Sequence, residues 1–222
     1  MRFKIDLKIF LIAFLFFVTS QIKVYVIMMI CAIIHELGHL LVGILLGMKP
    51  ERLELIPIGI RVIFKLNIKD INMKVKRTNR LEVKKIFVAL AGPLVNLILI
   101  YVVACLKINL IYKINFIYAN FLLLIVNLVP IYPLDGGRIL KGIILIFCGK
   151  EKAEGIMSVF SIIMSVIVTI IGSIAFISNK NIAIVFFLIY MWFIVIQERK
   201  FVKNKKLIYE ILGKTIEKNC EK

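Results

Sequence analysis

Long apolar runs, separated by short stretches rich in Lys and Arg, make up most of the 222-residue chain. A helix that crosses a membrane needs about 20 mostly apolar residues, and six stretches approach or exceed that length. We therefore predict an all-α membrane protein with about six transmembrane helices. The predicted spans are residues 8–20, 24–46, 86–106, 116–147 (broken at 130–133, where Pro130 and Pro133 interrupt the helix), 156–177 and 182–196.

The two ends of the chain need separate interpretation. Residues 8–20 follow a basic start and end in Val18-Thr19-Ser20, a pattern that also describes a secretory signal peptide. The sequence leaves open whether this segment is retained, and the topology of the rest of the membrane domain, up to residue 197, is the same either way. Residues 198–222 form a basic tail of about 25 residues, which is too short for a CBS or PDZ domain, so we expect neither.

Composition and charge narrow the class of protein and predict its orientation. Hydrophobic residues make up 61% of the chain, which excludes a soluble enzyme and a disordered basic tail. The net charge of +17 does not point to a nucleic-acid partner, because the basic residues flank the apolar runs. When the connectors are assigned alternately to two sides, 26 of the 30 Lys and Arg fall on one side. By the positive-inside rule both termini are cytosolic. The four exceptions are Lys23, Lys107, Lys113 and Lys180.

Four titratable side chains lie inside the predicted spans, where charged groups are costly and usually functional. His35, Glu36 and His39 form an H-E-x-x-H pattern in the second span. Two His four residues apart on a helix share one face and can bind one zinc ion, and the Glu beside the first can reach a water on the metal as a general base. Catalytic zinc sites usually have three protein ligands. The third predicted ligand is Asp135, the other acid at membrane depth, which follows two prolines.

The long connector after the second span has two parts. Residues 52–66 are rich in β-branched residues and contain a Pro-Gly break, which predicts a short membrane-associated β-hairpin after the metal-binding helix. Such a hairpin could pair with an unwound substrate by β-addition, or it could simply lie on the lipid surface. Residues 67–85 are strongly basic and are expected to bind anionic lipid, or alternatively an acidic segment of a substrate.

Three motifs together resemble the site-2 protease family of intramembrane zinc metalloproteases, over roughly residues 24–147 and more weakly in the flanking helices. The compact layout is most similar to the stage IV sporulation protein FB subgroup, which matures a pro-sigma factor in spore formers. The matching segments are 35–39 (HELGH), 92–96 (GPLVN) and 127–138 (NLVPIYPLDGGR).

The resemblance implies roles for individual residues. His35, His39 and Asp135 would bind one zinc ion per chain, with Glu36 as the general base. Asn127 would hold the substrate strand or the oxyanion, and Asn96 would line the site from the third helix. The alternative for both Asn residues is an interhelical hydrogen bond. Gly92-Pro93 is interpreted as a close-packing kink rather than a chemical element.

The predicted function is hydrolysis of a peptide bond in a membrane-anchored protein substrate, with a pro-sigma factor as the substrate that the resemblance suggests. An inhibitory membrane partner is compatible with that interpretation. His35 lies about 18 Å into the second span, which places the zinc nearer the cytosol. Two alternatives stay open: a membrane zinc transporter, which would need further ligands along its path, and an inactive metal-binding scaffold.

Overall fold

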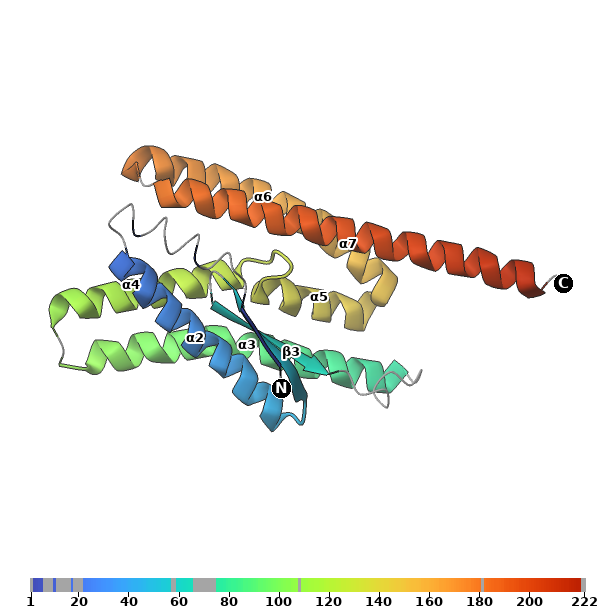
Figure 1. The fold of residues 1–222 in the computed structure, drawn as a ribbon, viewed down its shortest axis with the longest axis horizontal. Coiled ribbons are helices and arrows are strands. Elements are labelled where there is room, and N and C mark those ends of the chain that lie inside the picture. The colour runs from blue at the N-terminus through green and yellow to red at the C-terminus, as the bar shows by residue number, and fades with distance from the viewer. Residues whose placement is uncertain are drawn as a thin grey trace.

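The computed structural model shows a bundle of helices with a small sheet against one of them (Figure 1). It describes most of the chain from Ile22 onward and part of what precedes it. The predicted first span, 8–20, lies outside the described residues apart from Phe10 and Phe17, so its retention stays a prediction. The residues described are 2–5, 10, 17, 22–56, 59–65, 75–107, 109–180 and 182–220.

Helices account for most of the described chain. Four of them are long and apolar enough to cross a membrane, over Ile22–Leu45, Arg80–Cys105, Leu110–Leu128 and Lys152–Ser178. The helices are α2 (Ile22–Leu45), α3 (Val75–Cys105), α4 (Leu110–Leu128), α5 (Asp135–Cys148), α6 (Lys150–Asn179) and α7 (Ile182–Cys220).

Each predicted span that lies within the described residues overlaps these helices, and two of them differ clearly from the helices observed. The fourth, 116–147, is divided into α4 and α5, joined by the non-helical residues 129–134. The sixth, 182–196, is only the beginning of α7, which continues without interruption through the expected tail to Cys220. The apolar part of α7 ends at Gln197 and is followed by Glu198-Arg199-Lys200. Among the described residues, α7 is not one of the four candidate spans.

The prediction of strands after the second span agrees with a strand pair that the structure describes. β2 (Lys49–Ile56) and β3 (Gly59–Lys65) are antiparallel, with a register shift between Pro50 and Arg52. A further strand, β1 (Arg2–Ile5), pairs in parallel with β2 and was not predicted. Residues 57–58, between β2 and β3, lie outside the described part. Whether the sheet is associated with the membrane stays a prediction.

A tight turn at the end of α2 fixes where the sheet begins. Gly47 has a φ of 76° and donates its N–H to the carbonyl of Ile44, while Met48 donates to Gly43. A left-handed residue at this position ends a helix, and glycine adopts it without strain. The sheet then packs back on α2, where the Phe64 ring lies so close to Gly43 that a methyl group there would overlap it.

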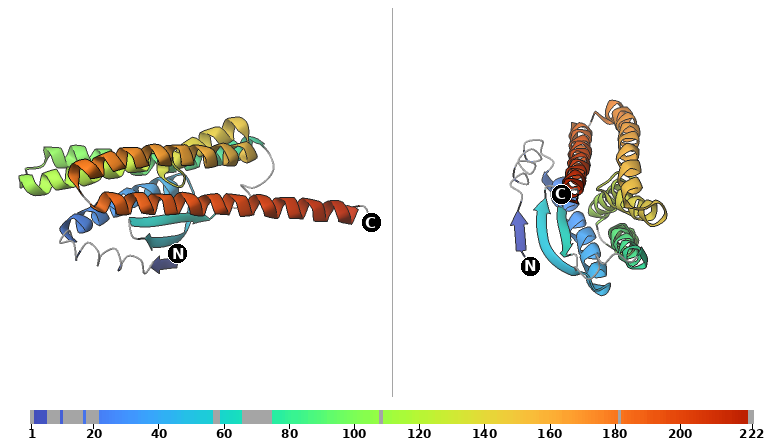
Figure 2. Two further views of the ribbon diagram at one scale, coloured as in Figure 1. Left: turned by 90° about the horizontal axis from the view of Figure 1, so that it is seen from above. Right: turned by 90° about the vertical axis from the view of Figure 1, so that its right-hand side faces the viewer.

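The helices form a core of α2, α3 and α4, with α5 against α3 and the α6–α7 pair outside (Figures 1 and 2). Cys31 and Ala32 of α2 pack against Ala119 and Leu123 of α4. The far end of α7 projects beyond the other helices in both figures.

Large apolar side chains also cover the outside of the bundle. On α3 alone, Leu94, Leu97, Ile98 and Tyr101 are each more than half exposed. Contiguous apolar surfaces of this extent are rare on soluble monomers, but they are what a bundle surrounded by lipid requires. The polar groups that the bundle does bury lie mainly in its interior, close to α2 and the start of α5.

Candidate metal centre

One face of α2 carries both His residues of the chain. The buried residues Cys31, His35, Gly38 and His39 recur every three or four positions, which is the spacing of a single helix face. His35 and His39 are each 2% exposed. The helix geometry therefore delivers two imidazole rings, one turn apart, to the interior of the bundle, as the sequence predicts.

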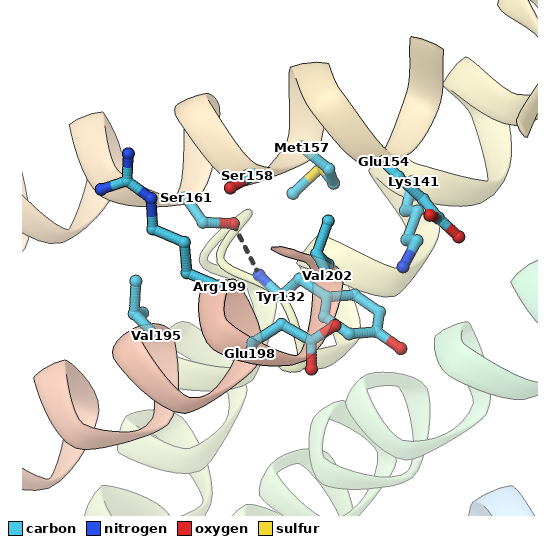
Figure 3. A pocket seen from close by; sticks show the side chains of 10 residues that line it. All are labelled: Tyr132, Lys141, Glu154, Met157, Ser158, Ser161, Val195, Glu198, Arg199 and Val202. Atoms are coloured by element: carbon cyan, nitrogen blue, oxygen red, sulfur yellow. Dashed lines mark hydrogen bonds between the residues drawn. The ribbon is translucent and has the colours of Figure 1, made fainter. Parts of the chain in front are cut away.

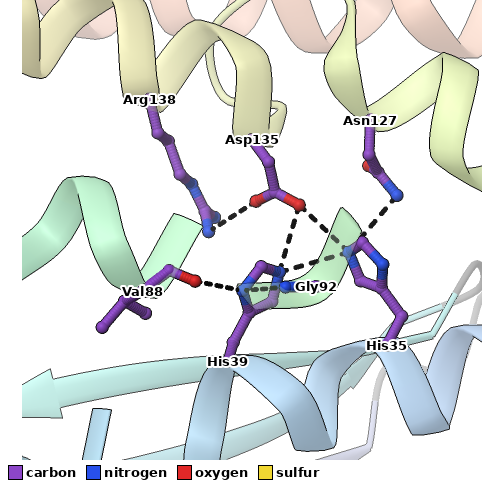
Figure 4. Close-up of polar contacts among 7 residues, drawn as sticks. All are labelled: His35, His39, Val88, Gly92, Asn127, Asp135 and Arg138. Atoms are coloured by element: carbon purple, nitrogen blue, oxygen red, sulfur yellow. Dashed lines mark hydrogen bonds and ion pairs between the residues drawn. The ribbon is translucent and has the colours of Figure 1, made fainter. Parts of the chain in front are cut away.

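Asp135 reaches the two rings from the opposite side, as the first residue of α5 (Figure 4). It is 4% exposed. Its Oδ2 lies 3.0 Å from Nε2 of His35 and 3.1 Å from Nε2 of His39, and the two Nε2 atoms are 3.2 Å apart. The non-helical residues 129–134 make this possible, because they end α4 and restart the chain as α5 beside the His face. Three atoms from distant parts of the sequence thus converge on one point. We call them the donor triangle: Nε2 of His35, Nε2 of His39 and Oδ2 of Asp135.

The spacing of the three donor atoms fits a bound metal ion. A tetrahedral zinc ion with bonds of about 2.0–2.1 Å needs donor atoms about 3.3 Å apart, and the observed separations are slightly shorter. His35, His39 and Asp135 form a buried group that could hold a metal. A cation at this point would accept lone pairs from both imidazole nitrogens and from the carboxylate oxygen at once, in a site where buried polar groups need partners.

The tautomer of His39 follows from its second ring nitrogen. Nδ1 lies 2.6 Å from the backbone carbonyl of Val88 on α3. A carbonyl can only accept, so Nδ1 carries the proton and Nε2 presents its lone pair to the donor triangle. The Gly92 N–H is also within 3.3 Å of Nδ1, but it is the longer contact. Metal-binding His residues commonly donate their other N–H in this way, which orients the ring.

The other predicted site residues lie at different positions relative to the donor triangle. Asn127, near the end of α4, places its amide nitrogen 3.4 Å from Nε2 of His35, so it lies beside the donor triangle. Asn96 is completely buried on α3, one turn beyond Gly92, and has no hydrogen bond within the described part of the chain. Glu36 is half-buried on α2, next to His35 in sequence. The structure therefore brings Asn127 to the three ligand atoms and leaves Asn96 one turn away.

Arg138 and Gly92 also lie at this site, although the sequence alone indicates no role in it for either residue. Arg138 is one turn after Asp135 on α5, and its Nη1 lies 3.5 Å from Oδ1, the carboxylate oxygen outside the donor triangle. The signal was present in the sequence, since positions three apart on a helix are neighbours. The Arg138 guanidinium thereby holds the carboxylate with Oδ2 turned toward the two His.

Gly92 is the point where α3 comes closest to the ligands. A Cβ at this position would lie 2.5 Å from Nε2 of His35 and equally close to Cε1 and Nε2 of His39. The interpretation of Gly92-Pro93 as a packing feature agrees with this geometry, with Pro93 inside α3. What α3 packs against here is the pair of imidazole rings that could hold a metal ion.

Comparison with known proteins gives a consistent family assignment. The sequence profile described as Peptidase family M50 matches residues 23–114 and 107–171. A zinc metalloprotease of Methanocaldococcus jannaschii is 27% identical over 201 residues, which is 86% of this chain and 54% of that protein. Stage IV sporulation protein FB of Bacillus subtilis is 30% identical over 137 residues, 60% of this chain and 44% of that protein. The chain spans about half the length of these two relatives.

A solved structure shares the fold. The site-2 protease from Methanocaldococcus jannaschii superposes with a TM-score of 0.63, covering 88% of this chain and 89% of that one, at 23% sequence identity. Together with the several apolar helices, these matches identify a multi-pass membrane protein.

Proposed function

The chain belongs to peptidase family M50, and from that premise we propose that it is an intramembrane zinc metalloprotease. The proposed reaction is hydrolysis of a peptide bond in or near the membrane segment of a membrane-tethered protein. The observation that carries the proposal is the buried triangle of His35, His39 and Asp135 donor atoms, 3.0–3.2 Å apart. Two imidazole nitrogens and a carboxylate oxygen at this spacing suit one zinc ion and leave a coordination position for water or substrate.

Each polar residue around the triangle has a proposed task. Zinc bound there would supply the Lewis acid that activates a water molecule and polarises the scissile carbonyl. Glu36 accepts a proton from the attacking water and passes it to the departing amine, so that water is added across the C–N bond. Asn127, beside Nε2 of His35, is positioned to donate its amide N–H to the substrate carbonyl or the oxyanion. Asn96 is proposed to line the site from α3, although it lies one helical turn beyond Gly92, the residue of α3 that approaches the two His rings.

The proposed orientation places both termini in the cytosol, as the distribution of Lys and Arg suggests. In that orientation α2 runs from outside to inside. His35 lies about 20 Å along α2 from Ile22, so the metal would be nearer the cytosolic side and reached by water from there. Cleavage at that depth would release a cytosolic product, which suits a membrane-tethered pro-sigma factor or another transcription factor.

The edge of the sheet suggests how a substrate is presented. A helical substrate hides its peptide bonds within its own hydrogen-bond ladder and must become extended before hydrolysis. β3 ends the strand order β1-β2-β3 of the described sheet, and an extended segment could add to its edge. Anionic lipid bound by residues 67–85 and an inhibitory membrane partner are further proposals that rest on charge and on the resemblance alone.

The distribution of ligands favours a protease over a zinc transporter. Within the part of the chain that the structure describes, one group of three metal-binding side chains is found, whereas a permeation path needs a series of them. A transporter would move zinc into vesicles even after Glu36→Gln, and an inactive scaffold would bind zinc without cleaving anything.

The test is co-expression with an epitope-tagged, membrane-tethered pro-sigma factor, followed by immunoblotting. We expect cleavage by the wild type, and none by Glu36→Gln, which should still bind zinc because both His ligands remain. Glu82→Gln is the matched control, since Glu82 lies on α3 and pairs with Lys85 at 2.7 Å. Cleavage that persists in Glu36→Gln would refute the proposed base. An unfolded protein such as casein, offered in detergent, tests peptidase activity separately from the choice of substrate.

A further inference from the structure

The segment that carries Asp135 into the site is held by very few backbone hydrogen bonds. Residues 129–134 join α4 to α5, and Pro130 and Pro133 have no N–H to donate. The N–H of Ile131 bonds within the segment, to the carbonyl of Val129, and that of Leu134 bonds to Ile131. Local turns of this kind shape the segment but do not attach it to the rest of the bundle.

One backbone hydrogen bond of this segment crosses to another helix. The N–H of Tyr132 donates to Oγ of Ser161 on α6, at 3.1 Å (Figure 3). Ser161 is a buried residue, so no water competes easily for this N–H. On the other side of the tyrosine ring, Nζ of Lys141 lies 3.9 Å from the ring centroid. The Ser161 hydroxyl is therefore a polar link between the backbone of this segment and the α6–α7 pair.

The side chain of Ile131, which precedes Tyr132 in the chain, packs the same segment against α7. Ile131 is 1% exposed and packs with Met191 and Val195 of α7. The apolar contact sets how deeply the segment sits against the helix pair, whereas the hydrogen bond from Tyr132 sets the direction of its backbone. Tyr132 is three residues before Asp135, so a rotation of its peptide plane would shift the start of α5 and the carboxylate with it.

We propose that Ser161 is a positioning residue for the metal ligand Asp135, acting through the Tyr132 N–H. This inference rests on the metal site proposed above. Without the hydroxyl, the Tyr132 N–H loses this acceptor, and the segment relaxes toward any other acceptor or toward water. Oδ2 of Asp135 then no longer meets the two Nε2 atoms at the observed spacing. Residues that orient metal ligands in this indirect way typically change metal affinity by about 10- to 100-fold when they are removed.

The α6 helix offers a matched control. Ser165 is one turn from Ser161, is completely buried, and uses its hydroxyl to donate to the carbonyl of Ser161 at 2.6 Å, within its own helix. Ser165→Ala therefore removes a buried hydroxyl from the same helix without touching the segment at 129–134. Ser161→Thr keeps the hydroxyl, and Ser161 lines a small pocket.

The experiment measures the dissociation constant for Zn²⁺ by chelator competition, using the full chain in detergent, together with the melting temperature of each metal-free variant. We expect Ser161→Ala to weaken Zn²⁺ binding by about tenfold or more. Ser165→Ala and Ser161→Thr should stay within about twofold of the wild type. Both metal-free variants should fold, and Ser161→Ala should melt below Ser165→Ala, because only Ser161→Ala removes the acceptor of the Tyr132 N–H.

Other results would overturn the inference. Wild-type Zn²⁺ affinity in Ser161→Ala, an equal loss in Ser165→Ala, or no retention of affinity in Ser161→Thr would each show that Ser161 does not position the ligand. Failure of Ser161→Ala alone to fold would assign Ser161 to general stability instead. If the wild type itself binds no Zn²⁺, the proposed metal site is what fails, and this outcome is distinct from all the others.

Discussion

Replacing Gly92 by Ala should weaken metal binding while leaving the fold in place. The added methyl group would stand 2.5 Å from Nε2 of His35 and from both Cε1 and Nε2 of His39. Non-bonded carbon and nitrogen atoms pack at about 3.5 Å or more, so each contact is about 1 Å too short. The rings cannot both turn aside, because their Nε2 atoms must converge on Oδ2 of Asp135, and the His39 ring is also held by the carbonyl of Val88.

The size of the effect follows from the packing. Forcing an additional methyl group into a close-packed interior costs about 1–3 kcal/mol. If the helices and rings absorb that cost only by moving the donor atoms apart, it appears in the metal affinity. Since 1.4 kcal/mol corresponds to a tenfold change, the dissociation constant for Zn²⁺ should rise by about 5- to 150-fold.

The assay is chelator competition on purified protein, with Gly155→Ala as the control. Gly155 lies in α6, and a Cβ there would meet nothing within 4 Å. In a helix, alanine is more favourable than glycine by about 1 kcal/mol, so Gly155→Ala should be no less stable than the wild type. Because Gly155 is not part of the site, the variant should also bind Zn²⁺ as the wild type does. A Gly92→Ala protein that binds Zn²⁺ with wild-type affinity would refute the reasoning, because the ligand rings would then have to tolerate the methyl group.

Further outcomes concern the metal ligand and the α6–α7 pair. Asp135→Ala should lose both zinc, measured by elemental analysis, and cleavage; retention of both would contradict a three-ligand site. Treatment of the wild type with a chelator should abolish cleavage, and added Zn²⁺ should restore it. Ile131→Ala should lower the free energy of unfolding by about 2–5 kcal/mol, which is checked by denaturant titration in detergent. Thr169→Val should remove the acceptor of the Trp192 indole N–H, 2.9 Å away, and cost about 1 kcal/mol. Trp192 is the single tryptophan of the chain, so its fluorescence reports the change, and an unaltered emission would contradict it.

The shared position of His35 and His39 on one helix face could be predicted from the sequence because a helix has a fixed geometry. Any helix through residues 35–39 brings His35 and His39 to one face, whatever surrounds it. Asp135 could be predicted for a different reason, namely that acids are rare at membrane depth and this one follows two prolines. The rigid period of a helix and the cost of charge in a membrane were sufficient to select the three residues that the structure brings together.

Features that depend on contacts between distant residues could not be predicted in the same way. β1 is four residues long and pairs with β2 about 50 residues away, so its short alternation carries no independent signal. The role of Gly92 appears only when α3 is placed against α2. Hydropathy shows where apolar sequence ends, but not where a helix ends. For this reason the sequence did not predict that α7 continues to Cys220, beyond the predicted boundary at residue 196.

The donor triangle joins residues about 100 positions apart in the sequence, and this has a thermodynamic consequence. His35 and His39 belong to α2, while Asp135 begins α5. A bound ion would therefore act as a cross-link that closes a long loop, and such closures remove much conformational freedom from the unfolded chain. Because the complete ligand set exists only in the folded bundle, metal binding and folding are linked. At a free metal concentration of 100 times the dissociation constant, the linkage adds about 2.7 kcal/mol to stability. The melting temperature of the bundle then becomes a direct measure of its metal occupancy.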